Sequence, residues 1–291
     1  MAIRKNQAKL SAEEKSRFVA AVLALKANGR YDQYVREHRD ASHGAHRGPA
    51  FLPWHREFLR RFELDLQSAV NDPTLGLPYW VWSVDTSPNA SIWGPDFLGG
   101  NGRPSDGKVM DGPFAFDAGN WTLNIRTSEE PAPYLRREFG RSAPSLPTPG
   151  HVESALGATP YDVAPWNASS SSGFRNRVEG WISGPQLHNR VHLWVGGSML
   201  PMTSPNDPVF FLNHCFVDKL WADWQAQHPG EGYRPTSGAH AGHNLNDLMQ
   251  PWNNVRPAEV LDHHALGYSY DTEPTDEPTI DITGALSLLL E

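Results

Sequence analysis

Histidine dominates the chemistry that this sequence could perform. The chain has 13 histidines but only one cysteine in 291 residues, so a bound transition metal must be held mainly by imidazole nitrogens. His188 and His192 are four residues apart, which places both imidazoles on the same side of one helix. Three further histidines, His38, His55 and His214, fall on the apolar faces of other expected helices. The spacing therefore directs five imidazoles toward the interior.

A sixth histidine, His46, lies in the loop between two of these helices, so the six form two groups that are well separated in the sequence. The groups are His38, His46 and His55, and His188, His192 and His214. Three neutral imidazoles are a suitable shell for one copper or zinc ion, and two facing shells make a binuclear site. No Asp or Glu occurs at the spacings of a zinc protease or a carboxylate-bridged di-iron bundle. All-imidazole ligation favours copper.

The elements that must position these histidines are mostly helices. A capping box at Ser11–Glu14 opens the first helix, and the apolar spacing predicts others. They begin near Tyr31, Pro53, Phe174, Gln186 and Asn206. Between about residues 86 and 173 the chain is rich in Gly, Pro, Asn and Ser, and we expect long irregular loops there. The sequence therefore predicts a mainly α protein.

Composition excludes several classes of function. Acidic residues exceed basic ones by 33 to 25, which argues against a nucleic-acid-binding protein. No apolar run reaches the roughly 18 residues that a membrane-spanning helix needs. The N-terminal residues contain no apolar segment of a secretory signal, so we expect a cytoplasmic protein, with export alongside a helper protein as the alternative. Nucleotide-binding and serine-hydrolase motifs are absent.

Five long motifs carry a resemblance to a known family. They are Phe51–Phe58, Leu77–Ser83, Val109–Phe114, Leu187–Gly197 and Ser204–His214. The sequence resembles the tyrosinase family of type-3 copper proteins, particularly the small members from actinomycetes. The resemblance spans residues 1–270, which we expect to form a single domain. It leaves residues 271–291 as an acidic, proline-containing tail, and Asp271–Asp281 within it as a solvated linker.

The resemblance implies a four-helix bundle that holds a dicopper centre, with long irregular loops and a few short strands. It implies that His38, His46 and His55 bind one copper ion, CuA, and that His188, His192 and His214 bind the other, CuB. Dioxygen is then the co-substrate. The loop before His46 is shorter than usual and also contains His43, which we interpret as solvated. The remaining loop histidines, His240, His243, His263 and His264, are expected to be exposed, with adventitious copper binding as the alternative.

Three further residues bear on the reaction that the resemblance implies. Glu179 and Asn189 match positions where the family is thought to hold a water molecule that acts as a base. Asn213 stands where tyrosinases commonly have a histidine that is not a copper ligand and lies at the substrate entrance. An amide cannot accept a proton as that histidine can, but it can bind an ortho amino group. These positions are expected to be catalytic.

We therefore predict an o-aminophenol oxidase that forms o-quinone imines and also oxidises o-diphenols, acting in secondary metabolism such as antibiotic biosynthesis. The alternative is a full tyrosinase with monophenol hydroxylase activity, as in melanin formation. A dioxygen carrier and a dizinc hydrolase are less favoured. Relatives of this kind often receive copper from a small helper protein, which is the partner that the resemblance suggests beside the phenolic or aminophenolic substrate.

Overall fold

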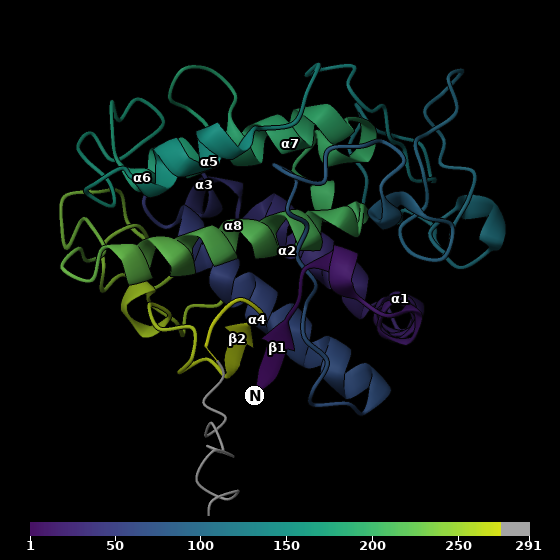
Figure 1. The fold of residues 1–291 in the computed structure, drawn as a ribbon, viewed down its shortest axis with the longest axis horizontal. Coiled ribbons are helices and arrows are strands. Elements are labelled where there is room, and N and C mark those ends of the chain that lie inside the picture. The colour runs from purple at the N-terminus through teal and green to yellow at the C-terminus, as the bar shows by residue number, and fades with distance from the viewer. Residues whose placement is uncertain (275–291) are drawn as a thin grey trace, which may run out of the picture.

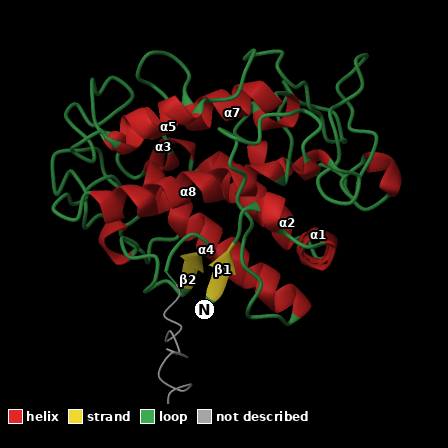
Figure 2. Cartoon of the chain, viewed as in Figure 1, coloured by secondary structure: helices red, strands yellow, loops and turns green. Residues whose placement is uncertain are grey.

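The computed structural model describes residues 1–274, and helices form most of the regular structure in this part of the chain (Figure 2). The helices are α1 (Ala12–Ala27), α2 (Arg30–Asp40), α3 (Ser42–Ala45), α4 (Phe51–Val70), α5 (Pro149–Leu156), α6 (Phe174–Glu179), α7 (Leu187–Val195) and α8 (Val209–Gln227). Two short strands, β1 (Ala2–Arg4) and β2 (Tyr268–Tyr270), pair in parallel. The mainly α class with a few short strands is confirmed. None of the described helices is long and apolar enough to cross a membrane.

Helices α2, α4, α7 and α8 form the expected bundle, in which the Tyr34 ring of α2 packs 5.4 Å from Phe58 of α4 and 6.4 Å from Phe211 of α8. Helix α4 packs against α1 and α8, and α7 packs against α8 on another side (Figure 1). The two longest helices are joined by stacked aromatic rings, since Phe62 of α4 and Phe211 of α8 have ring centroids 3.6 Å apart. Helix α8 is buried around nearly its whole circumference, which is what a helix with apolar residues on all sides requires.

The long region before α6 is irregular, as expected, with one exception. This exception is helix α5, which lies where only irregular loops are expected. Thr148 caps this helix by accepting a hydrogen bond from the backbone N–H of His151, and Pro149 is its first residue. The cap and the proline are ordinary start signals, but the helix is too short to show a clear apolar period. The rest of the region is held to the body by buried rings such as Trp80, Trp93 and Trp121.

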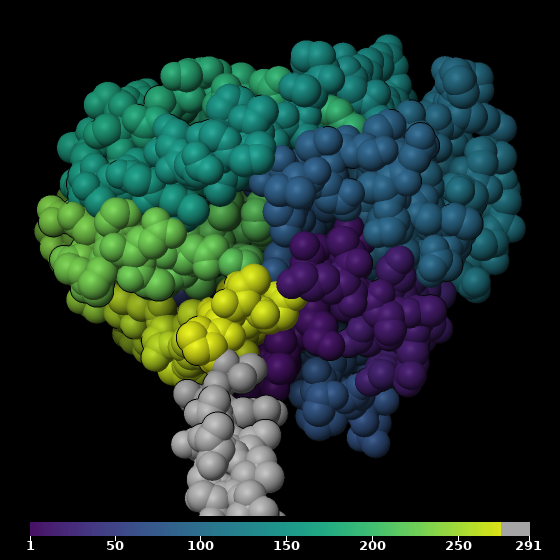
Figure 3. All heavy atoms as spheres, viewed as in Figure 1, coloured from purple at the N-terminus to yellow at the C-terminus, as the bar shows by residue number. Residues whose placement is uncertain are grey.

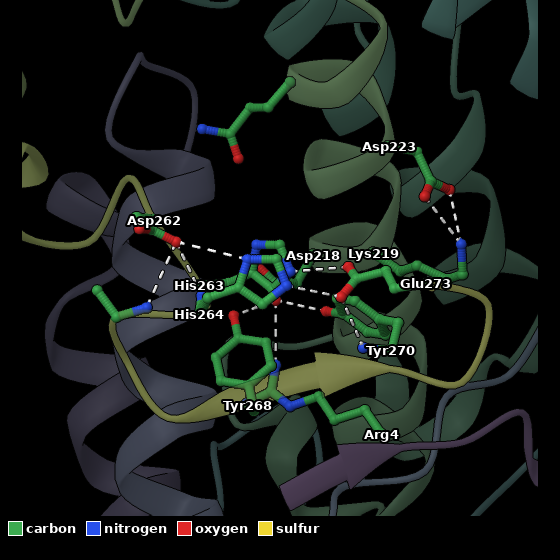
Figure 4. A network of polar contacts seen from close by, with 12 residues as sticks. Arg4, Asp218, Lys219, Asp223, Asp262, His263, His264, Tyr268, Tyr270 and Glu273 are labelled. Carbon is green, nitrogen blue, oxygen red and sulfur yellow. Dashed lines mark hydrogen bonds and ion pairs between the residues drawn. The ribbon is translucent and has the colours of Figure 1, made fainter. Parts of the chain in front are cut away.

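The two ends of the described chain meet on one face of the molecule. Figure 3 shows the N-terminal segment and the last described residues side by side, and their strands pair with Ala2 opposite Tyr268. Behind this pair lies a buried polar network (Figure 4). The Asp218 carboxylate accepts hydrogen bonds from Arg4 at 3.0 Å, from Tyr268 at 2.6 Å and from Tyr270 at 2.5 Å.

The start of the predicted solvated tail is instead attached to the body. Asp271 accepts a hydrogen bond from the Tyr79 hydroxyl at 2.6 Å and pairs with Lys9 at 3.3 Å. Glu273 pairs with His263 at 2.8 Å. The expectation of a solvated linker is therefore wrong for these first residues, because basic and hydroxyl groups of the body lie within reach. The remainder of the predicted tail lies outside the described residues.

Candidate metal centre

The structure brings the six predicted histidines into two groups of three. His38, His46 and His55 form one group, and His188, His192 and His214 form the other; within each, one ligand atom per residue lies within 4.8 Å of the others. Helices α2 and α4 supply His38 and His55, while His46 directly follows α3. Helix α7 carries His188 and His192, and α8 carries His214. The predicted grouping is confirmed.

The two groups share one buried centre. The rings of His55 and His214 stack with centroids 4.2 Å apart, although they belong to different groups. The rings of His46 and His188 are 6.2 Å apart across the same centre. His38, His55, His188 and His214 are each at most 3% exposed. The geometry is therefore that of one binuclear site.

Backbone carbonyl groups orient most of the rings. The Nδ1 atoms of His38 and His192 donate hydrogen bonds to the carbonyl oxygens of Met202 and Met199, both at 2.7 Å. His55 donates in the same way to the carbonyl of Phe51 at 2.8 Å. Because a carbonyl oxygen can only accept, each Nδ1 carries the proton and each Nε2 keeps a lone pair. This is how metal-binding histidines are usually held.

The other three rings are held differently. His46 Nδ1 lies 3.3 Å from the carbonyl oxygen of Ser42, a longer contact, and His188 Nδ1 lies 3.0 Å from the side-chain oxygen of Asn189. His214 Nδ1 has no hydrogen-bond partner among the described residues. Its ring is fixed by packing, with the Phe210 ring centroid 4.1 Å away.

Burial keeps all six imidazoles neutral. Desolvation lowers the pKa of His38 to about 3 and that of His192 to about 4, although the hydrogen bonds to backbone carbonyl groups oppose this shift. The pKa values of the other four lie well below the usual histidine range, again mainly through desolvation. Neutral imidazole is the form that binds a metal ion.

The unsatisfied nitrogen atoms fit two copper ions. The Nε2 atoms of His38 and His55 are buried without a hydrogen-bond partner in the described chain, which is costly unless a ligand binds them. The Nε2 atom of His214 lies 3.1 Å from that of His188 and 3.4 Å from that of His192. Metal–nitrogen bonds of about 2.0–2.1 Å place neighbouring donors of a tetrahedral shell about 3.3 Å apart. Neither group includes a carboxylate, so the donor set suits copper.

A cavity of about 310 Å³ opens above the centre. His38, His46, His188 and His192 reach it from below. Its walls combine apolar and polar groups: Arg47, Trp181, Asn189, Leu193, Leu200 and Pro201. This volume is at the lower end of the range for small-molecule sites and suits one substituted aromatic ring.

The two residues expected to hold a base lie in different environments. Asn189 lines the cavity, but its side-chain oxygen is engaged by His188. Glu179 is completely buried and accepts hydrogen bonds from Arg175 Nη1 at 3.0 Å and from the backbone N–H of Arg47 at 2.5 Å. Burial raises the pKa of the Glu179 carboxyl, while the charge of Arg175 opposes the rise. Glu179 does not line the cavity.

Asn213 does not occupy the expected entrance. It is completely buried on α8 and does not line the cavity above the histidines. Both its side-chain nitrogen and its side-chain oxygen lack a hydrogen-bond partner among the described residues. The expected position rests on analogy, and the structure buries this side chain outside the set of residues that line the cavity.

His243 is buried, contrary to the expectation from the sequence. Expected to be an exposed loop histidine, it is only 6% exposed and both ring nitrogens are used. Its Nδ1 accepts a hydrogen bond from the backbone N–H of Ala50 at 3.2 Å, and its Nε2 contacts the carbonyl oxygen of His43 at 3.3 Å. These contacts hold both sides of the loop that carries His46. Gly48 makes room for the ring, because a Cβ there would lie 2.6 Å from it.

The remaining loop histidines divide into two classes. His43, His240 and His264 are exposed, as expected. His263 is only 8% exposed, so that expectation is wrong for this residue: it packs against Tyr268, with ring centroids 5.5 Å apart. No periodic pattern in the sequence distinguishes the buried loop histidines from the exposed ones, because distant segments cover them.

Comparison with known proteins gives a consistent result. Residues 28–227 match the family model described as the common central domain of tyrosinase. The chain is 56% identical to a tyrosinase of Streptomyces glaucescens over 281 residues, covering 94% of this chain and all of that protein. It is 43% identical to the grixazone synthase of Streptomyces griseus over 306 residues, covering 92% of this chain and 99% of that protein.

Solved structures have the same fold. A polyphenol oxidase variant from Thermothelomyces thermophila superposes with a TM-score of 0.63 at 25% identity, covering 78% of this chain and 71% of the other. A tyrosinase from Burkholderia thailandensis superposes with a TM-score of 0.61 at 18% identity, covering 98% of this chain and 77% of the other. The second likeness shows the fold alone.

Proposed function

The chain belongs to the tyrosinase family and is a type-3 copper oxidase, and from this premise we propose that it acts on o-aminophenols and o-diphenols rather than on monophenols. The products are o-quinone imines and o-quinones. Each substrate loses two electrons and two protons, and two substrates reduce one dioxygen to two water molecules. Secondary metabolism is the setting we propose.

The observation that carries this proposal is the state of Glu179. Hydroxylation of a monophenol requires a base that removes the phenol proton before oxygen is transferred to the ring. Glu179, the residue expected to support that base, has both carboxylate oxygens engaged by Arg175 and by the Arg47 backbone. A substrate with two ortho heteroatoms needs no oxygen transfer, so it does not depend on this group.

Two coppers bound by the six histidines supply dioxygen binding and the transfer of electrons from the ring. The protein's own residues position the substrate. Leu193, Leu200 and Pro201 form apolar walls that favour an aromatic ring, and Asn189 also lines the cavity. The amide nitrogen of Asn189 lies 3.3 Å from the carbonyl oxygen of Gly180, so this side chain is held in one orientation and fixes the His188 ring.

The alternative is a full tyrosinase, and the 49–56% identity to four Streptomyces tyrosinases favours it. The 43% identity to an enzyme named grixazone synthase, rather than tyrosinase, favours the proposed function. The two functions share the dicopper site and differ only in oxygen insertion.

A substrate panel on copper-loaded protein distinguishes the two functions. The panel is tyrosine, 4-methylcatechol and 2-aminophenol, with initial rates measured by oxygen uptake. We expect the monophenol rate to be about 100-fold or more below the other two, a difference of about 2.7 kcal/mol in activation free energy. A tyrosine rate within a few-fold of the catechol rate would overturn the proposal and leave the dicopper oxidase intact.

A further inference from the structure

One side chain in the cavity has a charge that the oxidation itself does not use. Arg47 directly follows the ligand His46 and lines the cavity above the histidines. It is exposed, and its side chain forms no ion pair with any group in residues 1–274. Buried arginines such as Arg137 and Arg175 differ from it, since each is paired with a carboxylate. Arg47 therefore retains free guanidinium donors.

The backbone fixes where this side chain begins. Arg47 adopts a left-handed backbone conformation with φ of 60°, which few residues other than glycine favour. The backbone N–H of Arg47 donates to Glu179 at 2.5 Å, and that contact holds the turn. The guanidinium carbon lies 5.4 Å from the centroid of the Trp181 ring, close enough for a cation–π contact. The cation is thus placed at the rim beside an aromatic wall.

The electrostatics of the cavity favour an anionic substrate. Among the described residues, Arg47 is the only Lys, Arg, Asp or Glu that lines it. Two bound copper ions would add further positive charge below. A guanidinium presents paired N–H donors that match the two oxygens of a carboxylate.

We propose that Arg47 binds a carboxylate on the aromatic ring, so that the preferred substrates are acidic o-aminophenols and acidic catechols. This inference rests on the proposed function only in placing the ring over the histidines. The carboxylate lies at the rim with Arg47, and the two ortho heteroatoms point down toward the dicopper centre. Arg47 is a specificity-determining residue that recognises the substrate and takes no part in electron transfer.

The test compares 3,4-dihydroxybenzoate with 4-methylcatechol in the wild type and in Arg47→Gln. We expect kcat/KM for the benzoate to fall about 10- to 30-fold, mainly through KM, while the value for 4-methylcatechol changes less than about twofold. Arg47→Lys should restore part of the loss. Arg36→Gln, which removes another exposed arginine that does not line the cavity, should change neither value.

Equal losses for the charged and the neutral catechol would show that Arg47 only supports the His46 loop, and no loss would show that it does not contact substrate; either result overturns the inference. Because both test substrates are catechols, the result stands even if 2-aminophenol is not oxidised. Failure of the proposed function and failure of this inference are therefore distinguishable.

A second cluster of ligating groups lies apart from the dicopper centre, beside β2 (Figure 4). The Nε2 atoms of His263 and His264 contact the two carboxylate oxygens of Glu273 at 2.8 and 2.9 Å. The two rings are neighbours, with centroids 4.0 Å apart. Asp262 adds a carboxylate oxygen 3.8 Å from Nδ1 of His264. Asp262, His263 and His264 thus each offer one ligand atom within 4.8 Å of the others, while Glu273 holds the Nε2 atoms of both rings.

We infer that Asp262, His263 and His264 bind a divalent transition-metal ion such as zinc, with Glu273 supporting the two rings through their Nε2 atoms. A carboxylate on the second ring nitrogen, as Glu273 provides here at 2.8 and 2.9 Å, is the usual support for a metal-binding histidine. The side chain of His264 is 55% exposed and that of Asp262 is 67% exposed, so an ion can enter from solvent. Binding fixes both rings, which already tie Glu273 near the end of the described chain to the turn before β2.

Zinc titration of the dicopper holoprotein by calorimetry tests this site. We expect one zinc per chain, with affinity reduced at least about tenfold in His264→Asn and unchanged in His240→Asn, which removes another exposed histidine. Catechol oxidation should be unaffected by either variant. Absence of a saturable zinc equivalent, or equal binding in the two variants, would overturn the inference and show only adventitious binding.

Discussion

The two halves of the dicopper centre are built in different ways. All three CuB ligands lie within helices, two of them one turn apart on α7 and the third on α8. In the CuA half, His46 lies outside a regular helix, and its Nδ1 contact to Ser42 is 3.3 Å long. The CuA loop depends instead on Glu179 and His243, which come from distant parts of the chain. Local helix geometry thus fixes most of one half, and tertiary contacts complete the other.

Despite this difference, we expect catalysis to require both halves of the dicopper centre equally. His46→Ala and His192→Ala each remove one ligand, so one copper per chain should be lost and kcat should fall at least about 1000-fold. Metal analysis and catechol oxidation measure the two effects. If either variant retains more than a few per cent of activity with one copper, the centre does not require both halves.

Glu179→Gln should affect the CuA half of the dicopper centre more than the CuB half. The change leaves Arg175 without one of its two buried carboxylates and weakens the contact to the Arg47 backbone, so we expect a loss of about 3 kcal/mol in unfolding free energy. CuA should also become easier to remove with a chelator. The matched control is Asp162→Asn, which removes the other partner of Arg175 but does not touch the CuA loop.

Both variants should lower the urea midpoint by similar amounts, and only Glu179→Gln should speed the loss of the first copper. Equal copper loss in the two variants would mean that general loosening, rather than the Arg47 contact, controls the CuA half.

The difference between local helix geometry and contacts of distant segments also explains which parts of the site could be predicted from the sequence. The 3.6-residue period placed His38, His55, His188, His192 and His214 on inward faces because each lies on a helix with an apolar stripe. Even so, the carbonyl groups of Met199 and Met202, which orient His192 and His38, could not be identified. They lie in an irregular segment whose path depends on packing with other segments.

The loop ligand and its supports were harder to predict. His46 was assigned by resemblance, since nothing periodic marks a loop residue. His243 was misjudged because its partners, Ala50 and the carbonyl of His43, are about 200 positions away in the chain. Asn213 was placed by analogy, and the structure buries it instead. Contacts between remote segments are the part that local patterns do not encode.

Acid should weaken both halves together, because one ion pair joins them. Arg56, the residue after His55, pairs with Asp218 of α8 at 2.6 Å. Burial alone raises the pKa of Asp218, but Arg56 and Arg4 outweigh it and hold the pKa at about 2, below the ordinary value of 3.8. The stabilisation is therefore present above about pH 4 and is lost as the pH falls toward 2.

We expect about 2 kcal/mol of unfolding free energy to disappear over this interval. Chemical denaturation at several pH values, compared with Asp218→Asn, measures it. The variant should be less stable at pH 6 and should show a flatter pH dependence below pH 4. An unchanged acid slope in the variant would rule out Asp218 as the titrating group.

The smallest predicted effect falls on the CuA half alone. His243→Leu keeps much of the side-chain volume but removes the acceptor for the backbone N–H of Ala50 and the contact to the His43 carbonyl. We expect a loss of about 1–2 kcal/mol in unfolding free energy and copper release from CuA that is faster by about fivefold, with CuB unaffected. Stopped-flow chelation resolves the two release phases, and His240→Leu, at an exposed position in the same loop, is the control.

His243 contacts the His46 loop and no copper ligand directly. His243→Asn can still form a hydrogen bond, so it should restore part of the slow copper release from CuA. If both phases accelerate equally in His243→Leu, this loop supports the whole centre and the distinction between the halves does not hold.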